Sequence, residues 1–467
     1  MGTDSAIGCD VETANPVAVC TELDPESKSL EAKFCRQEFH IMSWTVAINH
    51  ATVTTPILYA SSVLTNENGQ AGNAMLYGST LICSLFFSTL IFGVVGPKKG
   101  LTLSMGLYSV YVLLFAVAAQ LCDRRNESNG ACVVGNTYQL PVNLAGALIG
   151  GIGAGVLWTC QGAFFTNCCQ RVAQAEHRCT SQITAELAGT FALIFLAAEA
   201  VVRASATILT KNAHLEYPIV FHIFGAVALV STLAFQIMAS SGEAPATTAT
   251  AATAAAGACS KAFSAVRQWK DPKTWFLQCT NLTFGFAAAW LGGYVGRNIL
   301  TETLSSEFIG FAGAMPSALA SVLSLGFGVV AKKLGKGPVL ALGAMAFLCL
   351  ALLSRFVHPK TWGWGVLVFY VLMGIGRAVY ESTNKAIFAD FFPGEKSAGA
   401  FANVFVFGTS AYTLAFAFGA SNQDTEELVL LITFAVLTVP GYLLASLMKR
   451  REDASQAADS KDASVSV

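Results

Sequence analysis

The chain has 467 residues, of which 54% are hydrophobic and only 12% charged, whereas about 25% of residues in soluble domains are charged. This composition excludes a soluble globular protein and indicates a protein that spans a membrane. The net charge of −1 supplies no basic field that could attract nucleic acid, so we expect no nucleic-acid partner.

Residues 1–38 contain eight acidic side chains, three basic ones and no apolar run. They are predicted to form a solvated cytoplasmic tail, because a signal peptide would need a continuous apolar core. Ala6 occupies the position at which a myristoylation signal after Gly2 requires Ser or Thr. No lipid is therefore expected at the N-terminus.

Twelve apolar windows follow, each long enough to cross a bilayer core, which takes about 20 residues. They are predicted at 39–64, 74–95, 101–121, 142–164, 180–202, 217–238, 275–296, 308–331, 338–357, 362–383, 397–420 and 427–448. The bilayer is thus the first partner, and we expect an all-α, multi-pass integral membrane protein.

The distribution of Lys and Arg predicts the orientation of these spans. On the side of the two termini the tails and loops hold 20 of them, the opposite loops hold 7, and Arg377 lies within a span. Positive residues are retained in the cytoplasm, so both termini are predicted to be cytoplasmic. The Asn126-Glu127-Ser128 glycosylation sequon then lies on the outside.

The thirteen cysteines do not have the spacing of a metal site, and we expect neither a metal nor a cofactor. Most are predicted to fill helix interfaces as small apolar side chains. Cys122 and Cys132 differ, because they flank the hydrophilic loop that carries Asn126. A disulfide is chemically allowed there if the loop lies outside the cytoplasm.

A linker at 239–274 is predicted to join two six-helix bundles, 39–238 and 275–448, with 449–467 as a second cytoplasmic tail. It begins with an Ala- and Thr-rich stretch and ends with a basic one. Phe263, Val266 and Trp269 recur every third residue of the basic part. This spacing suggests a short helix on the membrane surface.

Two stretches repeat between the bundles. Phe92–Val95 recurs as Phe327–Val330 in the second and eighth spans, and Gly151–Phe165 aligns with Gly374–Phe388 in the fourth and tenth. The separation of six spans is even, so both bundles run in the same direction. The sequence therefore predicts two parallel six-helix repeats related by an axis along the membrane normal.

The tenth span carries Arg377, Glu381 and Asn384 at i, i+4 and i+7, one stripe of a helix. A charge inside the membrane is costly, so Arg377 and Glu381 are predicted to neutralise each other. Trp158 and Gln161 align with Glu381 and Asn384 in the repeat.

Other polar positions lie in the first and fifth spans. Asn49 and His50 lie mid-span, where His50 either forms a structural hydrogen bond or carries a proton. Glu186 lies near the cytoplasmic end of the fifth span, and Glu199 and Arg203 at its outer end are predicted to form an interfacial ion pair.

These side chains are predicted to line either a substrate pathway or a packed cytoplasmic gate that never touches substrate. The set consists of Asn49, His50, Trp158, Gln161, Glu186, Arg377, Glu381 and Asn384. For Trp158 alone, a role as a core or interface aromatic residue is favoured. His222 is predicted to be structural.

Leu157–Thr166 and Gly376–Phe392 resemble the paired signatures of the unc-93-like branch of the major facilitator superfamily. The resemblance implies the twelve-helix fold of that superfamily. The chain departs from its mainstream members at Gly93–Gly100, which reads GVVGPKKG without an acidic residue. Some unc-93-like relatives are described as regulatory partners of potassium channels or as trafficking chaperones of innate immune receptors.

Two functions follow. The first is secondary transport of a small solute or ion by alternating access, with a proton or cation as the coupling ion. The alternative is a non-transporting partner of a channel or membrane receptor. An enzyme is not expected, because the loops contain no nucleophile, metal set or phosphate-binding motif.

Overall fold

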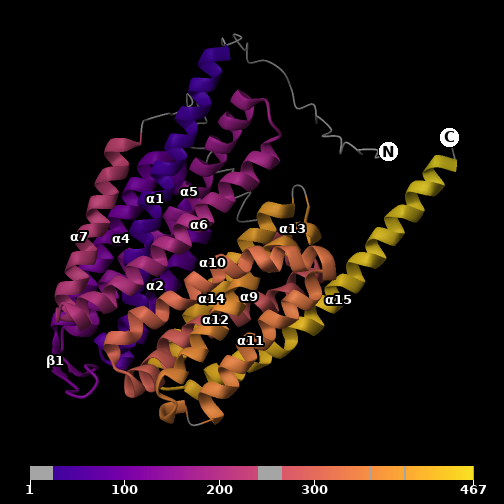
Figure 1. Ribbon diagram of the computed structural model, residues 1–467. Helices are drawn as coiled ribbons and strands as arrows, with labels where there is room; N and C mark the ends of the chain where they lie inside the picture. Colours follow the sequence, from indigo (N-terminus) through magenta and orange to yellow (C-terminus); the bar gives the residue numbers. More distant parts are fainter. Residues whose placement is uncertain (1–24, 240–265, 358, 394–395, 466–467) are drawn as a thin grey trace.

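A computed structural model describes residues 25–239, 266–357, 359–393 and 396–465. The described chain is almost entirely helical, and its helices form two bundles that lie side by side (Figure 1). We call them the N half, α1 to α7, and the C half, α9 to α15. The predicted architecture, twelve membrane helices in two parallel six-helix repeats, is confirmed.

The N half contains six long helical segments and one small hairpin. Its elements are α1 (Pro25–Val63), α2 (Asn66–Phe86), α3 (Ser88–Val95), α4 (Pro97–Gln120), β1 (Cys122–Arg125), β2 (Cys132–Gly135), α5 (Gln139–Glu176), α6 (Thr180–Thr207) with the π-helical η1 (Ile208–Asn212), and α7 (Tyr217–Met238). Strands β1 and β2 pair antiparallel.

The C half repeats the plan with more interruptions. Its elements are α9 (Pro272–Trp290), η2 (Leu291–Thr301), η3 (Ser306–Phe308), α10 (Ile309–Leu334), α11 (Lys336–Phe356), η4 (Pro359–Thr361), η5 (Gly363–Leu367), α12 (Val368–Val379), η6 (Tyr380–Asn384), α13 (Lys385–Phe391), α14 (Lys396–Ala420) and α15 (Asp424–Val465). Of these, η2 and η6 are π-helical.

Nine helices of the described chain are long and apolar enough to cross a membrane by length and composition. The remaining three spans are α1, α2 with α3, and α9 with η2. Helix α1 carries many polar residues, such as Asn49 and His50. The second span is broken between α2 and α3, and the seventh changes from the α-helix α9 to the π-helix η2.

Local sequence explains several helix starts. Gly96 has a φ of 77°, a value that favours glycine, and Pro97 then occupies the first turn of α4. Asp271 accepts a hydrogen bond from the backbone N–H of Lys273 and so caps α9, again with proline in its first turn. These signals place the sharp turns between spans.

Close helix contacts in the N half depend on the glycine-rich part of α5. A Cβ on Gly151 would lie 1.8 Å from Oγ of Ser79, and one on Gly155 would lie 2.8 Å from Cβ of Cys83. Both neighbours belong to α2. Glycine therefore allows α5 to approach α2 closely, as small residues do in membrane helix pairs.

The structure differs from the predicted tails and linker. Residues 25–38, placed by composition in the acidic tail, continue the first helix, and α15 runs on to Val465. Phe263 of the predicted surface helix lies outside the described residues. Val266 and Trp269 are exposed, and Nε1 of Trp269 donates a hydrogen bond to Oδ1 of Asn403, 2.8 Å away.

The two ends of the molecule are distinct in Figure 1. Helix α1 begins and α15 ends at one of them, which we call the terminal end. The β1–β2 hairpin lies at the opposite one, which we call the hairpin end.

Candidate functional site: an ion cluster between the two halves

The two halves are joined by a buried ion pair between α6 and α12. Arg377 on α12 donates to both carboxylate oxygens of Glu199 on α6, with N–O distances of 3.0 and 2.7 Å. The same guanidinium donates to Oγ of Ser317 on α10 at 2.8 Å. Glu199 is 2% exposed, so its charge depends on these partners.

A second arginine completes the cluster. Arg203 lies one turn beyond Glu199 on α6, 2.6 Å from its carboxylate, and donates to the backbone carbonyl of Gly313 at 3.1 Å. One carboxylate thus faces two guanidinium groups. We call Glu199, Arg203 and Arg377 the ion cluster.

Helical spacing explains why α6 presents these groups together. Phe191, Phe195, Glu199 and Arg203 recur every fourth residue, which places them along one face of the helix. Glu199 and Arg203 reach α12 and α10 of the C half, whereas Phe195 packs on His50 and Trp158 of the N half. The sequence prediction of a Glu199–Arg203 pair agrees with the geometry, but the pair also binds the other half.

The predicted pair between Arg377 and Glu381 is wrong. Glu381 instead accepts a hydrogen bond from Nζ of Lys385, 2.6 Å away, although it stays close enough to act electrostatically on Arg377. The physical reason is that each residue has another partner: Arg377 pairs with Glu199 of the other half, and Glu381, which lies within the π-helical turn η6, pairs with Lys385.

Aromatic side chains surround the ion cluster. The ring of His50 packs on those of Phe195, 4.9 Å away, and Trp158, 5.3 Å away. Tyr77 of α2 stacks on Tyr412 of α14 across the two halves, with 4.3 Å between ring centroids. His50 and both tyrosines lie within electrostatic range of the cluster.

Two of the predicted site residues, Asn49 and Asn384, each join helices that belong to the same half. Nδ2 of Asn49 donates to the carbonyl of Ala228 at 3.0 Å and to the hydroxyl of Ser231 at 3.2 Å, so it binds α1 to α7. Nδ2 of Asn384 donates to Oδ1 of Asn281 at 2.8 Å and binds η6 to α9. Both are buried and away from the ion cluster.

Gln161 is also buried, at 9% exposure, on the same helix as Trp158. It contributes to neither the ion cluster nor the aromatic group around His50. Nδ1 of His222 contacts the carbonyl of Pro218 one turn earlier, at 2.7 Å. Of the predicted pathway residues, Arg377 belongs to the ion cluster, and His50, Trp158 and Glu381 lie near it.

Glu186 belongs to a separate network at the terminal end of the N half. Arg36 of α1 contacts Glu176 at 2.8 Å and Glu186 at 2.7 Å, and Arg178 contacts Glu186 at 3.1 Å. The hydrogen bond to Glu176 raises the pKa of Arg36. The same bond lowers the pKa of Glu176, which lies beyond the predicted span 142–164.

Hydrogen bonds between the halves gather at the hairpin end. Thr207 donates to the carbonyl of Glu307 at 2.7 Å, and Tyr59 accepts from the backbone N–H of Gly310 at 2.8 Å. Ser62 and Thr301 lie 3.2 Å apart. The ion pairs described at the terminal end, by contrast, join elements of the same half.

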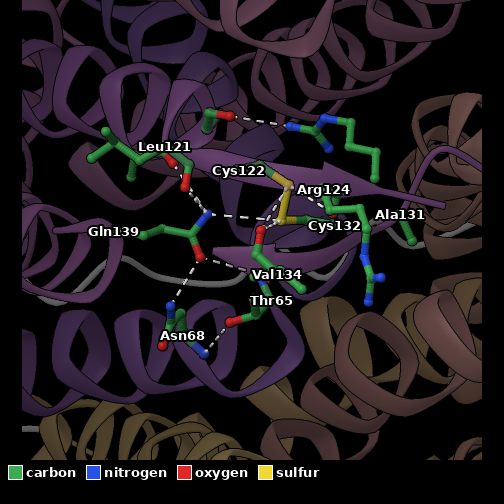
Figure 2. The surroundings of a disulfide bond; sticks show 12 residues. Thr65, Asn68, Leu121, Cys122, Arg124, Ala131, Cys132, Val134 and Gln139 are labelled. Atoms are coloured by element: carbon green, nitrogen blue, oxygen red, sulfur yellow. Dashed lines mark hydrogen bonds between the residues drawn. A yellow bond between two sulfur atoms is a disulfide. The ribbon is translucent and has the colours of Figure 1, made fainter. Parts of the chain in front are cut away.

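The hairpin itself takes part in this contact. The carbonyl of Asn129 accepts from the backbone N–H and the hydroxyl of Ser306, and its side chain donates to Glu302 at 3.0 Å. Cys122 and Cys132 form a disulfide that closes the hairpin (Figure 2). The β1–β2 loop is thereby fastened to η2 and η3 of the C half.

Gln139 ties the hairpin to the helices of its own half, as Figure 2 shows. Its amide nitrogen donates to the carbonyl of Leu121 at 3.4 Å, and its amide oxygen accepts from Asn68 at 2.9 Å. The side chain is fully buried. The buried hydrogen bonds of Gln139 therefore hold the hairpin against α2 and α5.

Comparisons with known proteins agree with this architecture. The chain matches no protein-family model. It is similar to Protein unc-93 homolog A of Bos taurus, with 25% identity over 413 residues, 80% of this chain and 84% of the relative. The match to the Mus musculus protein of the same name is 27% identical but covers only 40% of that relative.

Solved structures share the fold at low sequence identity. A D-xylose-proton symporter superposes with a TM-score of 0.59 and 13% identity, covering 90% of this chain and 97% of the symporter. A bacterial homologue of the human drug peptide transporters gives 0.55 and 14%, covering 92% of this chain and 100% of its own.

The chain has the fold of a multi-pass membrane protein of the major facilitator architecture. The similarity to Protein unc-93 homolog A confirms the resemblance to the unc-93-like branch that the sequence motifs predict. The chain is similar over most of its length to the unc-93-like branch of that superfamily.

Proposed function

We propose that the chain is a secondary transporter of a small solute or ion that works by alternating access. The ion cluster carries this proposal, because it is the buried charged contact by which the described residues join α6 of one half to α12 of the other. Charges inside a membrane are costly and mark functional sites. In a parallel-repeat transporter, the substrate site lies between the halves.

The distribution of polar contacts supports a particular state of the cycle. Contacts such as Thr207 with Glu307 and Asn129 with Ser306 join the halves at the hairpin end. At the terminal end, Arg36 pairs within the N half, and Lys336 with Asp390 within the C half. We infer that the hairpin end is closed and that transport separates these contacts.

The Lys and Arg bias supports an orientation with the terminal end and both termini in the cytoplasm. The exposed sequon at Asn126 and the disulfide at the hairpin end suit an extracellular or lumenal location. The described state would then face inward. His50, beside the cluster, is the candidate for a coupling proton.

Solute uptake by purified protein in liposomes, with and without a proton or sodium gradient, tests the proposal. Gradient-dependent uptake that is lost in Glu199→Gln but kept in Arg124→Gln supports transport. Arg124 is a suitable control because it is exposed on β1. No uptake across a broad panel, together with co-purification of a channel or receptor, supports the alternative of a non-transporting partner.

A further inference from the structure

We propose that the ion cluster binds a small organic carboxylate between the two halves. This inference rests on the proposed function, because it names the class of substrate that the same site would take.

The charge of the cluster is unbalanced. Glu199 carries one negative charge, and Arg203 and Arg377 carry two positive ones. The next charges along α12 and η6 are Glu381 and Lys385, which pair with each other at 2.6 Å and add no net charge. One positive charge therefore remains between the halves, where a cation would be repelled and an anion attracted.

The two guanidinium groups keep unused donors. Each carries five N–H groups. Arg377 uses its terminal nitrogens on Glu199 and Ser317, and Arg203 uses its own on Glu199 and the carbonyl of Gly313. The Nε atoms of both arginines are buried without a hydrogen-bond partner.

The arginine side chains are more exposed than the carboxylate. The side chains of Arg203 and Arg377 are each 13% exposed, whereas that of Glu199 is 3% exposed. Guanidinium groups bind carboxylates through paired, charge-assisted hydrogen bonds, a geometry that a spherical inorganic ion cannot use as fully.

The surroundings favour an organic anion over a strongly hydrated one. Phe195 precedes Glu199 by one helical turn, and His50 packs on its ring. Tyr77 and Tyr412 form a stack across the halves within electrostatic range of the arginines. These rings offer apolar faces to the carbon part of a ligand whose carboxylate lies on the guanidinium groups.

Ligand-dependent thermal stability of the purified full chain in detergent tests the proposal without requiring transport. The probes are sodium acetate, lactate and benzoate, each compared with its neutral amide at equal ionic strength. We expect at least one carboxylate to raise the melting temperature by about 2 °C or more in a saturable manner. The amides should not.

Arg377→Gln is the decisive variant, since it leaves Arg203 and Glu199 as a neutral pair. It should lose the carboxylate-specific shift, and Arg124→Gln should keep it. If no carboxylate exceeds its amide in the wild-type protein, the proposal is overturned whether or not the variant folds. A shift that survives Arg377→Gln overturns it as well.

Liposome uptake then separates this inference from the proposed function. Carboxylate binding without any uptake would support the site and contradict transport. Uptake of a cation or a neutral solute that carboxylates neither stabilise against heat nor inhibit would support transport and contradict the carboxylate.

Discussion

Arg377 on α12 and Glu199 on α6 form a two-pronged ion pair that connects the two halves of the molecule. Because Arg203 contacts the same carboxylate, removing Arg377 and removing Glu199 change the charge balance of the cluster differently. Removing the arginine leaves a neutral pair, whereas removing the carboxylate leaves two unbalanced positive charges. The first prediction follows from this asymmetry.

We predict that Glu199→Gln destabilises the protein more than Arg377→Gln does. An uncompensated buried charge costs about 3 to 5 kcal/mol, and Glu199→Gln should fall near this range, whereas Arg377→Gln should cost about 1 to 3 kcal/mol through its lost hydrogen bonds. Thermal stability in detergent measures both. Adding Arg377→Gln to Glu199→Gln should recover part of the loss, because one surplus charge is removed.

Glu381 supplies the control for this double-mutant cycle. It is paired with Lys385 and lies within the π-helical turn η6, so its coupling to Arg377 should be much smaller. Equal coupling of Arg377 to Glu199 and to Glu381 would contradict the geometry described above.

The second prediction concerns Gly310, where α10 of the C half approaches the N half. A Cβ at this position would lie 2.2 Å from the backbone oxygen of Arg203 and 2.7 Å from the hydroxyl of Tyr59. Gly310→Ala should therefore force the halves apart and cost about 1 to 3 kcal/mol. The measurement is again the melting temperature.

Gly326 on the same helix is the matched control. A Cβ there meets nothing within 4 Å, so Gly326→Ala should be neutral or stabilise the helix slightly. If both substitutions had the same effect, close approach at Gly310 would not be what holds the hairpin end together.

The architecture could be predicted from the sequence because span length and repeated motifs are properties of the chain read along its length. The site could not be predicted in the same way. Arg377 finds its partner 178 residues away on the facing half, and spacing within α12 gave no signal of that. A regular α-helical spacing of four residues predicts Glu381 as the partner of Arg377, but Glu381 lies in the π-helical turn η6, where that spacing does not hold.

The sequence predicts Glu199 at the outer end of its span, because the apolar window ends earlier than the helix does. The predicted span 180–202 stops soon after Glu199, but α6 continues to Thr207 and η1 to Asn212. The residue therefore lies well inside the helix. A usable signal was present, since Glu199 and Arg377 are opposite charges inside apolar spans of different halves.

The third prediction tests orientation through the hairpin. Asn126 is exposed, and its side-chain oxygen accepts hydrogen bonds from the backbone N–H and hydroxyl of Ser128, at 2.9 and 2.6 Å. In a eukaryotic host, glycosidase should shift the wild-type protein but not Asn126→Gln. Asn281 also lies in a sequon but is buried in α9, so Asn281→Gln should leave the pattern unchanged.

A cytoplasmic hairpin would give the opposite pattern. No glycosidase shift, combined with labelling of the reduced Cys122 and Cys132 from the cytoplasmic side alone, would reverse the proposed orientation. The ion cluster and its predicted energetics would be unaffected, because they do not depend on which side the hairpin faces.

The fourth prediction concerns the part of α1 that composition assigned to a solvated tail. Arg36 lies between Glu176 and Glu186, with side chains 24 to 40% exposed, so Arg36→Gln should cost at most about 1 kcal/mol near neutral pH. A tail without a fixed position would show no such cost. Lys449→Gln is the control, because Lys449 forms a longer ion pair, 3.5 Å, with the exposed Asp453 one turn later on α15.

The pH dependence of this cost has a definite sign. Hydrogen bonding to Arg36 lowers the pKa of Glu176, so the stabilisation is complete above the pKa of an unfolded glutamate, about 4.3, and is lost as the pH falls through the folded value. The difference in melting temperature between wild type and Arg36→Gln should therefore shrink as the pH is lowered from about 5 to about 3. A difference that is constant over this range would mean that Arg36 acts through packing of its side chain and not through its charge.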